Sequence, residues 1–286
     1  MTRDISKAVV LITGGSSGIG YATARELSQR GATVIITSRS LESANAAAKA
    51  ISQESGNQVE GWALDLSRMS SVRNFADAYS QRNKKLNILI NNAGTIAGKR
   101  IVTEDSLELT FATNFLGPFL LTKLLMPQLE TAGDARILNV SSELYRNAKP
   151  GLDFSNLQLE KGFSSSLAYA QSKLAMMLFT LQLRERLNGS HVSSFAIHPG
   201  VIRTNFGSGP ESSRSMKLMM KVLGPVLKSP EAGALTSIHL ATAPLDSINH
   251  AWYWSEAKPG QPQAVALDKA AGRKLWDVSE SLVSET

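Results

Sequence analysis

The chain has 286 residues, no cysteine, and a formal charge of +6 from 30 lysines and arginines against 24 aspartates and glutamates. The length suits one α/β domain with a large core, and the lack of cysteine excludes disulfides and thiol catalysis and suits a reducing cytoplasm. The scattered positive charges argue against a nucleic-acid partner, no segment is long and apolar enough to span a bilayer, and no histidine spacing indicates a metal site.

Short β-branched apolar runs alternate with helical segments along the chain. Such alternation is typical of a doubly wound, mostly parallel sheet with helices on both faces. With no linker, internal repeat or shift in composition, the sequence predicts one α/β Rossmann domain over residues 1–286, with seven strands. The strands are expected at 7–13, 32–39, 58–66, 85–94, 135–142, 191–200 and, at an edge, 248–254; the first helices at 20–31 and 40–56; and a last amphipathic helix at about 270–283.

The first expected strand runs into the glycine-rich segment TGGSSGIG (13–20). Its spacing is G-x-x-x-G-x-G rather than G-x-G-x-x-G, but glycines between a strand and a helix still let a pyrophosphate approach the backbone. The start of the helix adds N–H groups and a positive dipole. The segment therefore predicts nucleotide binding, although a plain glycine-rich turn would have the same composition. The residues expected at the cofactor are Gly14, Ser16, Ser17, Gly18, Ile19 and Gly20.

The end of the second strand selects the nucleotide. Ser38-Arg39 carries no carboxylate that would bind an adenosine ribose and repel a 2′-phosphate, and the guanidinium of Arg39 suits that phosphate. The sequence therefore predicts NADP(H) rather than NAD(H), with a surface arginine as the alternative reading. Further cofactor contacts are expected where two later strands end, at Asp65, Leu66, Asn92, Ala93 and Gly94.

Tyr169 and Lys173, in YAQSK, are four residues apart and share a face if the segment is helical. At about 6 Å and an effective dielectric constant of about 20, an ammonium stabilises a phenolate by roughly 3 kcal/mol, or about two pKa units. On this argument the lysine lowers the pKa of the phenol toward a range useful for proton transfer. The same spacing also occurs in ordinary helix-face residues, so the other motifs must decide.

Taken together, these motifs resemble those of the short-chain dehydrogenase/reductase family. Within it they look most like the branch of the retinol dehydrogenases, the WW-domain oxidoreductase and the more distant protochlorophyllide reductases. The likeness spans nearly the whole chain. It rests on TGGSSGIG, Asp65-Leu66, NNAG (91–94), Asn114, NVSS (139–142), YAQSK and HPGVIRT (198–204), and for the branch on Ser38-Arg39 and the segments 172–187 and 271–282.

The resemblance implies roles for individual residues. Tyr169 would be the catalytic acid/base, Lys173 would lower its pKa and hold the nicotinamide ribose, Ser142 would orient the substrate carbonyl, and Asn114 would anchor a water in a proton relay. Alternatively, Ser142 could merely cap the end of a strand, and Asn114 could only satisfy backbone groups at a helix kink. His198 is interpreted as structural. The turn beside the nicotinamide would comprise Pro199, Gly200, Val201 and Thr204.

The expected reaction is hydride transfer between NADP(H) and a ketone, aldehyde or secondary alcohol. A substrate loop is expected at about 143–167, and a methionine-rich lid at about 205–228 indicates a lipophilic small-molecule substrate, with a packed surface helix or an oligomer contact as the alternative.

Other readings stay open at this point. Reduction of a conjugated C=C bond or an imine, and a non-catalytic NADP(H)-binding sensor or scaffold, are the alternatives for function. Many retinol dehydrogenases have an apolar N-terminal anchor, whereas this chain begins a few residues before its first strand, which favours a cytoplasmic reductase. The resemblance also implies a homo-oligomer formed through the helices that carry Asn114 and Tyr169.

Overall fold

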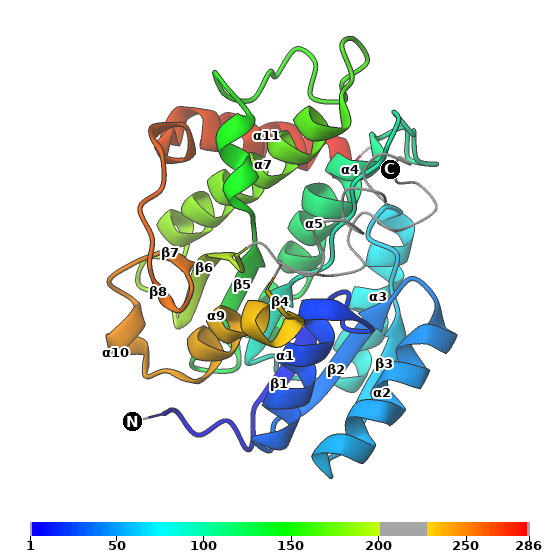
Figure 1. Ribbon diagram of the computed structural model, residues 1–286, viewed down its shortest axis with the longest axis vertical. Coiled ribbons are helices and arrows are strands. Elements are labelled where there is room, and N and C mark those ends of the chain that lie inside the picture. Colours follow the sequence, from blue (N-terminus) through cyan, green and yellow to red (C-terminus); the bar gives the residue numbers. More distant parts are fainter. Residues whose placement is uncertain (1, 201–227, 285–286) are drawn as a thin grey trace.

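Eight strands form one sheet in the order β3-β2-β1-β4-β5-β6-β7-β8, in a computed structural model that describes residues 2–200 and 228–284 (Figure 1). All neighbouring strands pair in parallel except β7 and β8. The strands are β1 (Val9–Ile12), β2 (Thr33–Ser38), β3 (Val59–Ala63), β4 (Ile88–Asn91), β5 (Ala135–Val140), β6 (Val192–His198), β7 (Tyr253–Ser255) and β8 (Lys258–Pro259).

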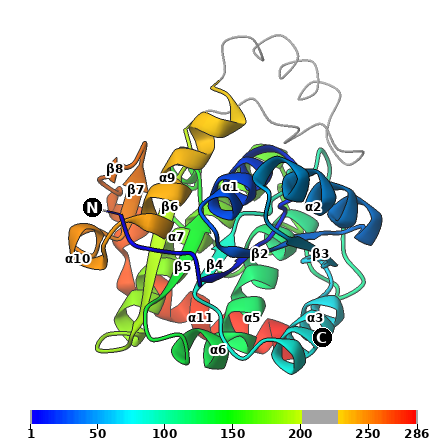
Figure 2. The same cartoon turned by 90° about the horizontal axis from the view of Figure 1, so that it is seen from below.

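Helices cover both faces of this sheet, and Figure 2 shows the two helical layers with the strands between them. Helices α1, α2 and α9 pack together on one face, and α3, α5 and α7 on the other. The helices are α1 (Gly18–Gln29), α2 (Leu41–Ser55), α3 (Met69–Arg82), α4 (Leu109–Phe111), the π-helical turn η1 (Ala112–Leu116), α5 (Gly117–Leu124), α6 (Met126–Glu130), the 3-10 turn η2 (Glu143–Asn147), α7 (Ser165–Arg186), α9 (Pro230–Thr242), α10 (Leu245–Ile248), the 3-10 turn η4 (Ala264–Leu267) and α11 (Lys269–Ser284).

The continuous apolar runs of the strands serve two cores at once. In β1, Leu11 packs in the core beneath α3, α5 and α7, whereas Val10 and Ile12 pack in the core beneath α1, α2 and α9. In β4, Leu89 likewise packs in the first of these cores and Ile90 in the second. Successive side chains of a strand point to opposite faces, so a strand covered on both faces must be apolar throughout. The predicted fold class is confirmed.

The sheet has one strand more than the sequence predicted, at the end expected to be the edge. β7 covers only Tyr253–Ser255, and the antiparallel β8 pairs outside it. The two residues between them, Glu256 and Ala257, have φ of 52° and 56°, the left-handed conformation of a two-residue hairpin, usually encoded by Asn-Gly. Thr236 Oγ accepts a hydrogen bond from Ala257 N at 3.0 Å. A tertiary contact thus supports a turn that lacks the usual sequence signal.

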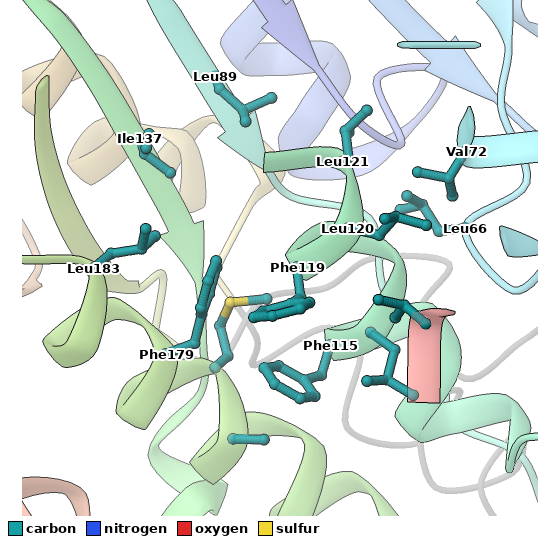
Figure 3. Packing of buried hydrophobic residues seen from close by; sticks show 14 of the residues in the cluster. Leu66, Val72, Leu89, Phe115, Phe119, Leu120, Leu121, Ile137, Phe179 and Leu183 are labelled. Atoms are coloured by element: carbon teal, nitrogen blue, oxygen red, sulfur yellow. The ribbon is translucent and has the colours of Figure 1, made fainter. Parts of the chain in front are cut away.

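Helix α7 packs on the sheet, and α11 packs against α7 (Figure 1). Trp276 of α11 lies 5.2 Å from the ring of Phe119 and 5.8 Å from that of Phe179, and the guanidinium of Arg186 lies 4.1 Å from the Trp276 ring. Figure 3 shows Phe115 beside Phe119 and Phe179 in this core. The C-terminal helix therefore covers part of the α5 and α7 surface.

The aromatic contacts of α11 predict the effect of a substitution there. Trp276→Ala should lower the free energy of unfolding by about 3 kcal/mol, because it removes a large ring from an aromatic cluster. Asp277→Ala changes the next residue, which is exposed, and should cost less than about 0.5 kcal/mol. Urea unfolding of the three proteins measures both values, and equal losses for the two variants would contradict the role given to Trp276.

Candidate active site

The segment between β1 and α1 makes a turn whose backbone leaves no room for a side chain at Gly14 or at Gly20. Gly14 has φ of 66°, and a Cβ there would lie 2.9 Å from Ala93 Cα. A Cβ at Gly20 would lie 2.5 Å from Asn92 Nδ2 and 2.5 Å from the Gly14 carbonyl oxygen. Only a residue without a side chain allows the turn to contact the end of β4 this closely. The start of α1, at Gly18, lies beside this contact.

Thr13, which the sequence analysis did not single out, joins the ends of β1 and β4. Its hydroxyl oxygen accepts hydrogen bonds from Asn92 N and Ala93 N, each at 3.0 Å, and its carbonyl accepts one from Asn92 Nδ2 at 2.8 Å. Its only signal in the sequence is its place directly before the first glycine. A glycine turn leading into a 12-residue helix fits a dinucleotide pyrophosphate, which the helix N–H groups and dipole would hold. At the same edge lie Ser16 and Ile19, half-buried, and Ser17 and Gly94, exposed.

The ends of β2 and β3 form the next part of this edge. Ser38 is half-buried and Arg39 is exposed, and Arg39 and Asp65 line one groove of about 710 Å³. Asp65 Oδ1 accepts hydrogen bonds from Ser67 N at 3.0 Å and Ser67 Oγ at 2.6 Å, which orient the carboxylate. The side chain of Leu66 packs in the hydrophobic core with 3% exposure, so that side chain is not available to a cofactor.

The structure brings Ser142, Tyr169 and Lys173 together, from the end of β5 and from α7. Lys173 Nζ lies 5.6 Å from the centroid of the Tyr169 ring and donates to Val140 O at 2.8 Å. Ser142 and Tyr169 share a side-chain hydrogen bond. Tyr169 is 8% exposed and Lys173 is 3% exposed, so both polar groups lie almost wholly out of water.

The predicted lowering of the Tyr169 pKa is wrong for the protein in this structure. Burial raises the pKa of the phenol to about 12, and the hydrogen bond with Ser142 only partly opposes that rise. Burial also lowers the pKa of Lys173 to about 8. The expected separation between Lys173 and Tyr169 is present. However, burial removes both side chains from water and so disfavours the charged phenolate and the charged ammonium. This effect reaches about 3–5 pKa units for a fully buried group. At neutral pH, Tyr169 therefore keeps its proton.

Asn114 is fully buried in the π-helical turn η1 and bonds to other parts of the protein. Its Oδ1 accepts from Thr95 N at 2.7 Å, and its Nδ2 donates to Thr95 O at 2.9 Å and to Ser172 Oγ at 3.0 Å. Ser172 in turn donates to Tyr169 O at 2.8 Å. Asn114 thus connects the segment after β4 to α7. Single π-helical turns are frequent at functional sites, and the water relay itself stays a prediction.

The turn after β6 begins with Pro199 and Gly200, and Gly200 has φ of 89°. Val201 and Thr204 lie outside the described residues, as does the expected lid at 205–228 except for Lys228. The connection from β5 to α7 begins with η2. The loop that follows η2 projects beyond the end of the sheet and then returns to the start of α7 (Figure 1). The described site therefore comprises the cofactor edge and the Ser142, Tyr169 and Lys173 cluster.

A mostly parallel sheet with this glycine turn and this cluster is typical of a nucleotide-binding oxidoreductase. Residues 8–214 match the family model for short chain dehydrogenases. The chain is 39% identical to human (Homo sapiens) retinol dehydrogenase 11, over 99% of this chain and 87% of that protein, and 37% identical to mouse (Mus musculus) retinol dehydrogenase 14, over 96% and 85%. It belongs to the short-chain dehydrogenase family.

Solved structures agree with this assignment. An uncharacterized protein from Mycobacterium paratuberculosis is 33% identical with a TM-score of 0.78, over 99% of this chain and 96% of that one. A metagenomic short-chain oxidoreductase in complex with NADP is 24% identical with a TM-score of 0.65, over 91% and 99%, which shows the shared fold. Among the helices of residues 2–200 and 228–284, none is long and apolar enough to cross a membrane.

The close approach at Gly20 predicts a selective loss of cofactor binding. Gly20→Ala should weaken binding of NADPH at least about tenfold, because a methyl group 2.5 Å from Asn92 Nδ2 and the Gly14 carbonyl oxygen must push the turn and the end of β4 apart. Gly189→Ala adds the same methyl group where no atom lies within 4 Å, and should leave binding unchanged despite its φ of 83°. Titration of NADPH fluorescence compares the two, and unchanged binding by Gly20→Ala would contradict this account of the turn.

Proposed function

We propose that this protein is an NADP(H)-dependent oxidoreductase that transfers hydride between the nicotinamide and a lipophilic ketone, aldehyde or secondary alcohol, with Tyr169 as acid/base. The observation that carries the proposal is the buried cluster in which Ser142 hydrogen-bonds to Tyr169 and Lys173 lies 5.6 Å from the phenol ring. The cluster lies at the carboxyl end of β5 in a member of the short-chain dehydrogenase family.

Bound NADPH would supply the hydride, and this chain's residues handle the proton and the oxygen of the substrate. With its pKa raised to about 12, Tyr169 is a phenol at neutral pH and donates a proton to the oxygen that becomes the alcohol. Ser142, hydrogen-bonded to Tyr169, orients the same oxygen. Lys173 holds its Nζ beside the ring through Val140 O and places positive charge where a phenolate would form. A proton-bearing phenol is the form that reduction of a carbonyl requires, whereas oxidation of an alcohol would require the phenolate.

The preference for NADP(H) rests on the end of β2. Arg39 is an exposed cation immediately after Ser38, and it lines the same groove as Asp65. A guanidinium suits a phosphate, and no carboxylate at this position repels one. Two structures with the same fold are described in complex with NADP and NADPH, which supports the choice.

The proposed substrate class is supported by the relatives. They are named retinol dehydrogenases, and retinol is an apolar alcohol. The natural first panel for an activity screen therefore contains retinaldehyde beside simpler apolar aldehydes and ketones.

The assigned proton donor predicts a large loss of turnover on removal of one hydroxyl group. Tyr169→Phe should lower kcat for carbonyl reduction about 10³-fold, a typical contribution for a positioned acid. Tyr21→Phe removes the hydroxyl of an α1 tyrosine that bonds only to Glu54 among the described residues, and should leave kcat unchanged. Loss of NADPH absorbance in the presence of the aldehyde and ketone panel measures both. Turnover retained by Tyr169→Phe would refute the assigned chemistry.

The phosphate role of Arg39 predicts a change in cofactor preference. Arg39→Asp should weaken NADPH binding by about 10- to 100-fold, the worth of a hydrogen bond to a charged group, with little loss for NADH. Arg82→Asp makes the same charge change at another residue lining the same groove and should affect both cofactors alike. Dissociation constants for the two cofactors give the ratio. Equal losses of NADPH and NADH in Arg39→Asp would exclude the phosphate contact.

A further inference from the structure

We propose that His198 is a positioning residue, which holds the Ser142 hydroxyl and the Pro199-Gly200 turn in place by accepting a hydrogen bond from the backbone N–H of Glu143. The proposal rests on the proposed function, in which Ser142 orients the substrate carbonyl. His198 Nδ1 lies 3.3 Å from Glu143 N, and the histidine is buried with 9% exposure. Glu143 directly follows Ser142, and His198 directly precedes Pro199, so one bond acts on both parts of the site.

The bond stands at the point where β5 and β6 separate. The two strands stay paired as far as the bond from Ser141 N to Ile197 O at 2.7 Å. Hydrogen bonds of a parallel pair are evenly spaced along each strand, so the next donor, Glu143 N, would face the carbonyl of Pro199. The imidazole of His198 accepts this bond instead. The main chain after His198 is thereby free to turn away from β5 without leaving Glu143 N unpaired.

Glu143 is also fixed through its side chain. Tyr253 of β7 donates its hydroxyl hydrogen to the Glu143 carboxylate, and Arg146 forms an ion pair with the same carboxylate. The residue therefore ties the end of β5 to β6 through its N–H and to β7 through its carboxylate. Ser142 directly precedes Glu143 and has an extended backbone. A rotation of the peptide between Ser142 and Glu143 would therefore move the serine.

The bond requires an imidazole with no proton on Nδ1. Burial lowers the pKa of His198; within the described part of the chain Glu143 and Glu256 oppose this shift, and Arg146 and Lys228 reinforce it. Because the folded pKa lies below the ordinary value of about 6.5, the acceptor is fully present above that pH and is lost as the pH falls through the folded pKa. Acid should therefore loosen the link between His198 and Glu143.

Two substitutions separate the hydrogen bond from the bulk of the ring. His198→Asn places an amide oxygen near the position of Nδ1 and does not titrate, whereas His198→Phe keeps a ring and removes the acceptor. We expect kcat for carbonyl reduction to fall about tenfold in His198→Phe, with KM for NADPH changed less than threefold, and to stay within about threefold of wild type in His198→Asn. Urea unfolding of each variant identifies a general loss of structure.

The pH dependence gives a second readout. In the wild-type protein kcat should fall as the pH decreases from 7 to 5, and His198→Asn should show a weaker fall because its acceptor does not titrate. Hydrogen–deuterium exchange of residues 142–147 needs no turnover: it should be faster in His198→Phe than in the wild-type protein or His198→Asn.

The outcomes are distinguishable. Equal kcat values and equal exchange in the Asn and Phe variants would overturn the proposal, as would the same acid dependence in His198→Asn and in the wild-type protein. A wild-type protein that reduces no carbonyl compound would refute the proposed function and with it the catalytic part of this inference, whereas the exchange comparison would still decide on the hydrogen bond.

Discussion

Two hydrogen bonds that run in opposite directions between α7 and the end of β5 hold the site together. Lys173 donates from Nζ to Val140 O, and its own carbonyl accepts from Ser141 Oγ at 3.0 Å. All of these groups are buried, and an unpaired buried polar group costs about 1–3 kcal/mol, more for a charge. The helix therefore cannot slide along the sheet without a penalty. Ser142, one residue on, is placed at Tyr169 as a result.

The burial that fixes this geometry also sets the proton affinities. A cation about 6 Å from a phenol favours phenolate by roughly 3 kcal/mol at an effective dielectric constant of about 20, but desolvation opposes it and acts on both groups. The pKa of Tyr169 rises to about 12 and that of Lys173 falls to about 8. In this protein desolvation prevails, so Tyr169 keeps its proton at neutral pH, as the proposed role of proton donor requires.

The strand order explains why distant motifs meet at one edge. The strand order reverses between β1 and β4, because successive strands are added on one side of β1 and then on the other. In open α/β sheets, ligands usually bind in the crevice at the carboxyl ends of the strands at such a switch point. The glycine turn follows β1 and the Asn92-Ala93 segment follows β4, and Thr13 bonds the two together. Ser142 follows β5 and His198 ends β6, so the residues proposed to hold the cofactor and to transfer the proton lie at the same edge.

The sequence by itself determined the class of fold, the glycine turn and the shared face of Tyr169 and Lys173, because apolar periodicity, glycine placement and helical spacing are local properties of a chain. Only the tertiary structure decided the proton affinity of Tyr169, the bond from Glu143 to His198 and the hairpin that adds β8. Each of these depends on which distant segments of the chain pack around a group, and the spacing of residues along the sequence does not reveal that packing.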